Sequence, residues 1–134
     1  MDLSKLNWLA VLAAAVSTFM LGGAWYSPAL FGRAWQRESG LTNDQLKSRS
    51  MGAVFGTSFL LALIMAFNLA AFLQGPADIA WGISAGALAG IGWVAMAMGV
   101  TYLFEARSMK LFLSDSGYHA FAFMLMGGIL GAWK

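Results

Sequence analysis

Residues 79–104 read IAWGISAGALAGIGWVAMAMGVTYLF, and this stretch decides the fold because it contains no charged residue. A helix needs roughly 20 apolar residues to cross the hydrocarbon core of a bilayer, and this run exceeds that length. The backbone must satisfy its own hydrogen bonds in hydrocarbon, which leaves helices and closed barrels. The run is too continuous for the alternating pattern of a barrel strand, so we predict a transmembrane helix.

Three further apolar runs cover residues 6–26, 51–73 and 110–133. The four runs predict an all-α membrane protein, with four transmembrane helices in an antiparallel bundle that forms one domain over residues 1–134. We expect the first run to be a span and not a cleaved signal peptide, because its start is nearly neutral and no A-x-A site follows it. Such a thin bundle is expected to have little room for an internal cavity.

The composition supports this assignment. Hydrophobic residues make up 60% and charged residues 10%, against roughly 45–50% and about 25% in soluble domains. This excludes an ordinary water-soluble domain, a disordered chain and a nucleic-acid binder. Zero Cys and one His exclude disulfides and a Cys or His metal cluster. Without a phosphate-binding loop or a nucleophile with a base, we predict no enzyme, no catalytic residue, no metal and no cofactor.

Two connections carry local signals. In the turn at residues 74–78, Gly75 can end a helix, Pro76 cannot continue it and Asp78 can cap the next. So short a turn predicts that the second and third spans lie side by side. In the longer connection of residues 27–50, apolar residues on one helical face predict a short amphipathic helix in the membrane interface, ended by Gly40. Thr42 and Gln45 then form a capping box, and we expect the second helix to begin near residue 43.

The distribution of Lys and Arg predicts the orientation. The first and third loops together hold six basic residues, and the opposite side of the membrane holds two. Basic loops stay in the cytoplasm. We therefore expect both termini outside, in a multi-pass protein of the bacterial cytoplasmic (inner) membrane.

Small residues provide the packing signal. GxxxG spacing occurs in the second, third and fourth spans, at Gly52 and Gly56, at Gly82, Gly86 and Gly90, and at Gly127 and Gly131. Helices in lipid associate through close backbone approach at such residues. A second small-residue stripe on the third span predicts that this helix is central. The stripes indicate either packing within one bundle or, for a stripe such as that of the fourth span, an oligomer interface.

Polar residues within the fourth span are candidate functional groups. Asp115 and His119 share a helical face, with Tyr118 alongside. If the helix begins near Met109, Asp115 lies two turns inside and His119 lies near the midplane, where the pair could relay a proton or hold a ligand. If the helix begins at Ser114 instead, Asp115 is an ordinary first-turn acid and His119 a structural hydrogen-bonding group.

Three more polar residues lie near span ends. Glu105 ends the third span, near Arg107 and Lys110. A carboxylate there is unfavourable unless paired, so we expect a structural salt bridge at the interface, with a basic residue of the first loop as a candidate partner. Glu105 could also line the cytoplasmic mouth of a pathway. Asn7 and Asn68 lie near the outer ends of their spans, and we expect a hydrogen bond between them to hold the first two helices together.

Several strings resemble a known family. Trp25-Tyr26-Ser27-Pro28, Leu103-Phe104-Glu105 and Gly117-Tyr118-His119 are similar to strings in the domain of unknown function 1761 family, small bacterial four-helix membrane proteins. The resemblance covers nearly the whole chain. It implies four spans and a membrane location, and it implies no activity.

Two functions therefore remain open. The first is a membrane protein that acts by association, as a homo-oligomer or as an accessory subunit of a larger membrane complex, with the bilayer and itself as partners and no nucleic acid. The alternative is a small oligomeric transporter or channel for protons or a small solute that uses Asp115 and His119. The direction in which these two side chains point distinguishes the alternatives.

Overall fold

The computed structural model describes residues 3–75 and 78–133, and every regular element in these ranges is helical. The long apolar helices are α1, α4, the continuous segment α5–η2–α6 and α7. The elements are η1 (Leu3–Lys5), α1 (Trp8–Trp25), α2 (Gly32–Ser39), α3 (Asn43–Lys47), α4 (Met51–Phe72), α5 (Ile79–Ala89), the π-helical turn η2 (Gly90–Ala95), α6 (Met96–Phe104) and α7 (Met109–Ala132). The fold class is thus all-α, as expected.

Each long helix begins at a side chain that caps it. Asn7, Ser50, Asp78 and Ser108 each accept a hydrogen bond from a backbone N–H in the first turn of the following helix. The cap at Asp78 was expected from the sequence. Because α7 begins directly after Ser108, the longer of its two predicted forms is correct.

The connections match the sequence in part. The interfacial helix α2 forms and ends at Gly40, whose φ of 75° is left-handed, and Gly75 has a φ of 98°. The capping box of Thr42 and Gln45 is present. The second helix does not begin near residue 43, because α3 is a separate short helix and α4 begins only at Met51. The predicted role of Pro76 and the basic residue Lys134 lie outside the described residues.

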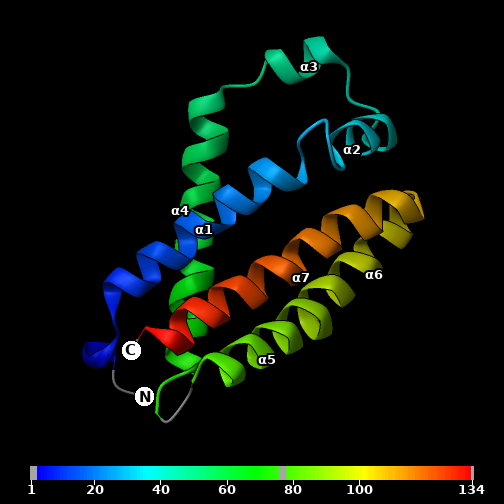
Figure 1. The fold of residues 1–134 in the computed structure, drawn as a ribbon. Coiled ribbons are helices and arrows are strands. Elements are labelled where there is room, and N and C mark those ends of the chain that lie inside the picture. Colours follow the sequence, from blue (N-terminus) through cyan, green and yellow to red (C-terminus); the bar gives the residue numbers. More distant parts are fainter. Residues whose placement is uncertain (1–2, 76–77, 134) are drawn as a thin grey trace.

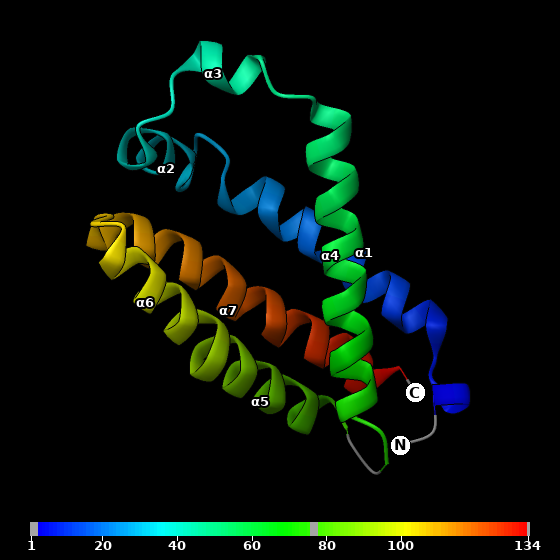
Figure 2. The same ribbon diagram turned by 180° about the vertical axis from the view of Figure 1, so that it is seen from behind.

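The central helix is α7, not the third span as predicted. It packs against α1 on one side and α5–η2–α6 on another, and it also contacts α2 and α4. Figures 1 and 2 show α7 between these neighbours, with the chain ends at one end of the helices and α2, α3 and the α6–α7 connection at the other. The third span packs mainly on α7, where glycines of both helices meet.

Backbone contact joins α5 to α7. A Cβ atom on Gly82 would lie 2.8 Å from the carbonyl carbon of Gly127, and one on Gly127 would lie 2.8 Å from that of Gly82. A Cβ on Gly86 would lie 2.7 Å from the carbonyl carbon of Phe123, and one on Gly131 would lie 2.8 Å from that of Asp78. These positions exclude any side chain, so the glycine stripe of α7 lies inside the protein and is no oligomer interface.

The position of α4 differs most from the prediction. The second and third spans meet at their turn and then diverge, so they do not lie side by side along their length (Figure 1). All of the buried residues of α4 lie between Ala62 and Ala71, where it contacts α1 and α7. Its first half diverges from these helices, as Figure 2 shows. The GxxxG pair Gly52 and Gly56 has nothing within 4 Å of a Cβ position.

Three helical segments are long and apolar enough to cross a membrane: Trp8–Trp25, Met51–Phe72 and Ile79–Phe104. Helix α7 has 24 residues but is not among these three. Its polar residues, including Asp115 and His119, lower its mean hydropathy. The predicted count of four spans is therefore not confirmed, while the three apolar helices indicate a membrane protein.

The glycine contact predicts a difference between two Gly→Ala substitutions in the third span. Gly86→Ala should destabilise the protein by about 1–3 kcal/mol, because the new methyl group meets the backbone of α7. Gly92→Ala has open space around it and should be neutral or stabilising, since Ala favours a helix. Thermal unfolding in detergent measures both. Equal effects would contradict the assignment of this backbone contact.

Candidate functional site

The carboxylate of Asp115 joins three helices. Its Oδ1 atom accepts a hydrogen bond from the hydroxyl of Tyr26 at 2.8 Å, and its Oδ2 atom accepts one from the hydroxyl of Tyr102 at 2.5 Å. Tyr26 is the C-terminal cap of α1 and Tyr102 lies in the last turn of α6. We call these three residues the tyrosine–carboxylate node. Each carboxylate oxygen has a donor, so the node links the loop-side ends of α1, α6 and α7.

Neighbouring contacts strengthen this end of the protein. The indole Nε1 of Trp25 donates to the carbonyl oxygen of Ser114 at 2.9 Å, beside the node. The guanidinium carbon of Arg107 lies 5.6 Å from the centre of the Tyr102 ring, within the range of a cation–π contact. Side chains from α1, α6, α7 and the α6–α7 connection are thus held together around Asp115.

Glu105 forms the expected salt bridge, but its partner is Arg107 and not a basic residue of the first loop. Its Oε1 atom lies 2.7 Å from Nε of Arg107, only two residues away, and not near a basic residue of the first loop. Both side chains are exposed. The short α6–α7 connection places Arg107 closer than any first-loop residue, and the carboxylate of Glu105 raises the pKa of the Arg107 side chain. Glu105 therefore lies outside the tyrosine–carboxylate node.

His119 lines a cleft that Asp115 does not reach. The hydroxyl of Tyr118 donates to the carbonyl oxygen of Thr18 at 2.9 Å, which ties α7 to α1. The His119 ring lies 5.0 Å from the Tyr118 ring. Both residues line a cleft of about 610 Å³ between α1, α4 and α7, which we call the lateral cleft. Asp115 does not line this cleft, so the predicted pair of Asp115 and His119 is divided between two environments.

The lateral cleft corrects the expectation of little free space. Most of its lining is apolar, and the polar side chains in it are Thr18, Tyr26, Ser58, Tyr118 and His119. It exists because the first half of α4 diverges from α1 and α7 (Figure 1). The space therefore lies beside the helices and not inside a closed bundle.

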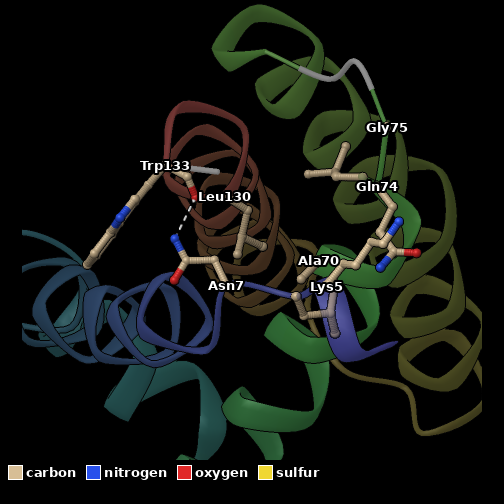
Figure 3. Close-up of a pocket in the computed structure, with 9 residues that line it drawn as sticks. Lys5, Asn7, Ala70, Gln74, Gly75, Leu130 and Trp133 are labelled. Carbon is tan, nitrogen blue, oxygen red and sulfur yellow. Dashed lines mark hydrogen bonds between the residues drawn. The ribbon is translucent and has the colours of Figure 1, made fainter. Parts of the chain in front are cut away.

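The predicted hydrogen bond between Asn7 and Asn68 is absent. Asn7 accepts from the N–H of Ala10 as a helix cap, and its Nδ2 atom donates to the carbonyl oxygen of Trp133 at 3.2 Å (Figure 3). Asn68 instead donates to the carbonyl oxygen of Ile64, one turn back in its own helix. Both amides thus satisfy nearby backbone groups. The Asn7 contact joins the two ends of the chain beside a cavity of about 320 Å³.

Sequence reasoning missed the two tyrosines of the node. Tyr26 was considered only as part of the Trp-Tyr-Ser-Pro string, and Tyr102 was not singled out. Their depth in the membrane could have indicated the contact. Both tyrosines lie at the loop-side ends of their spans, and Asp115 lies two turns inside from the same side. No group of three or more potential metal-binding side chains occurs in the described part of the chain.

The comparisons with known proteins identify a family. A family model described as "Protein of unknown function (DUF1761)" matches residues 9–131. The chain belongs to this family. No curated protein and no solved structure gave a match.

The node predicts coupled effects on stability. Asp115→Ala should lower the free energy of unfolding by about 1–3 kcal/mol, because two partly buried hydroxyl donors lose their acceptor. Tyr26→Phe alone should cost about 1 kcal/mol, and it should cost less when Asp115 is already Ala. Thermal unfolding of the two single variants and the double variant measures the coupling. His119→Ala serves as the control, and additive effects of the Asp115 and Tyr26 substitutions would contradict the node.

Proposed function

We propose that this member of the DUF1761 family acts by association within the bilayer, as a homo-oligomer or as an accessory subunit of a larger membrane complex, and not as an enzyme. We further propose that α7 is a fourth span, that both termini lie outside, and that the membrane is the bacterial inner membrane. The positions of the two chain ends, at the same end of the helices in Figure 1, agree with an even number of spans.

The first half of α4 carries this proposal. Residues 51–58 are exposed except for the half-buried Val54, and Gly52 and Gly56 face open space. Exposed apolar residues are ordinary in lipid, but paired glycines on a lipid-facing surface provide no packing of their own unless another helix approaches them. By helical spacing these glycines lie on the side of α4 opposite Val54 and Ser58, which line the lateral cleft. We call this side the α4 glycine face.

The placement of α7 supports its role as a fourth span. Its apolar half, from Phe121 to Ala132, packs between α1 and α5, two of the three apolar helices. Two polar side chains in its first half are hydrogen-bonded to neighbouring helices, because Asp115 accepts from Tyr26 and Tyr118 donates to Thr18. Hydrogen bonds of this kind inside the protein lower the cost of placing a helix of lower hydropathy at membrane depth.

Association predicts a change of mass on substitution of the α4 glycine face. Native mass spectrometry of the gently extracted protein should give a multiple of the 14.3 kDa chain or a larger complex. Gly52→Val with Gly56→Val should shift it to the monomer, because bulk there separates the helices. Gly92 in the third span also has open space around it, and Gly92→Val should leave the assembly intact. A monomeric wild-type protein would refute association.

A second candidate function is transport through an oligomer, which the position of His119 favours. This side chain lines the lateral cleft and makes no hydrogen bond to the described residues. Asp115, in contrast, accepts hydrogen bonds from two tyrosines. An imidazole at this depth is suited to proton transfer. In this proposal Asp115 positions the helices and His119 alone contacts the transported species.

Transport predicts a proton flux that depends on His119. Protein in liposomes that enclose a pH-sensitive dye should dissipate an imposed pH gradient faster than empty liposomes. His119→Gln should lower that rate by about tenfold or more, in the range by which positioned proton-transfer groups act, while leaving thermal stability unchanged. Ser58→Ala, which alters the opposite wall of the cleft, is the control. Equal rates for wild type and His119→Gln would exclude this function.

A further inference from the structure

A third cavity lies at the loop end of the protein. It has a volume of about 690 Å³ and lies between α2, the start of α4 and the residues that connect them. Arg33, Arg49 and Gln36 are among the side chains that line it, together with the indole of Trp35. We call this space the basic mouth. Its size, like that of the lateral cleft, falls in the range of roughly 300–1,000 Å³ found for ligand sites.

The basic mouth continues into the lateral cleft. Both spaces are lined by Tyr26, Val54, Phe55 and Ser58, so they meet along one side of α4. The lateral cleft extends from there past apolar side chains such as Phe19 and Met65. One continuous surface therefore changes from cationic at the loop end to apolar at membrane depth.

Within the described residues, neither arginine of the mouth forms an ion pair with a carboxylate. In residues 3–75 and 78–133 the one ion pair is that of Glu105 and Arg107, which lies at a different connection. Nε of Arg49 donates to the carbonyl oxygen of Leu46 at 3.3 Å, which orients the guanidinium and leaves its terminal nitrogens without an anion. Two such groups beside an apolar cleft provide charge complementarity for an anion that carries a hydrocarbon chain.

We propose that the basic mouth and the lateral cleft together bind one anionic phospholipid. The phosphate and its headgroup lie between Arg33 and Arg49, and an acyl chain extends along α4 into the lateral cleft. Anionic lipids are favoured because two uncompensated cations at a membrane surface attract net negative charge, which a zwitterionic headgroup lacks. The amphipathic helix α2 places Arg33 at the headgroup level, and Trp35 has the ring type that prefers this interface.

This ligand site is independent of the proposed association. The α4 glycine face lies on the opposite side of α4 from Val54 and Ser58, the residues that face the two cavities. A lipid in the cleft therefore leaves the glycine face accessible. Binding per chain and oligomeric state can be measured separately in the same spectrum.

The test is native mass spectrometry of protein transferred from vesicles that contain equal amounts of phosphatidylglycerol and phosphatidylcholine. We expect wild-type protein to retain phosphatidylglycerol in preference, at one per chain. Arg33→Gln with Arg49→Gln should lower that retention by about tenfold or more, since each basic group near the surface contributes to lipid affinity. Arg37→Gln with Lys47→Gln is the matched control, because it removes the same charge from residues that do not line the mouth.

A second pair of variants tests the acyl-chain part of the site. Ser58→Trp should fill the shared wall of the two cavities and lower retention, whereas Thr57→Trp, at an exposed neighbouring position outside the lining, should not. Equal retention of the two lipids by wild-type protein would overturn the headgroup assignment. Equal losses in the two double-charge variants would show diffuse attraction and would also overturn the site, whatever the oligomeric state.

Discussion

The close approach of α5 and α7 is the contact on which the rest of the structure depends. Lipid tails are as apolar as the helix surfaces, so apolar character alone does not select which helices pair. Gly82, Gly86, Gly127 and Gly131 remove the side chains between two backbones, which then meet more closely than any Cβ would allow. This contact fixes α7 beside the third span, and α1 and α4 then pack on the remaining surface of α7.

The position of α7 in turn places Asp115 between two tyrosines. With α7 fixed against the third span, its polar first half lies at the level of Tyr102, and Tyr26 reaches it from the end of α1. The node and the glycine contact hold opposite ends of the same helix. Helix α4 has no comparable contact in its first half, so it diverges, and the lateral cleft is the result.

The sequence predicted where the helices lie along the chain far better than which helices pack against each other. Long apolar runs, capping residues and left-handed glycines are local signals, and they correctly located α2, Gly40, Gly75 and the cap at Asp78. Which helix is central depends on which glycine stripes match in space. A single sequence shows several stripes of equal quality, so the third span was predicted to be central where α7 is.

The same limit applies to the polar residues. The spacing of Asp115 and His119 correctly places them one turn apart. It does not reveal that the hydroxyls of two tyrosines donate hydrogen bonds to the carboxylate of Asp115. The Asn7–Asn68 prediction was wrong because each amide donates to a backbone carbonyl instead, Asn68 to Ile64 in its own helix and Asn7 to Trp133 at the other end of the chain. The contact of Asn68 is local and available in any helix, whereas that of Asn7 depends on how α1 and α7 pack.

The division of Asp115 from His119 also bears on function. A carboxylate whose two oxygens accept hydroxyl donors from α1 and α6 has a positioning role that any movement of those helices would disturb. His119, one turn further along, lies on the wall of a cleft. The other wall is the first half of α4, which has no buried residue. Helix α5 thus packs closely on one side of α7, and the lateral cleft opens on another. Any ligand or partner that fills the cleft acts on α4, which packs least extensively against the others among the four long helices.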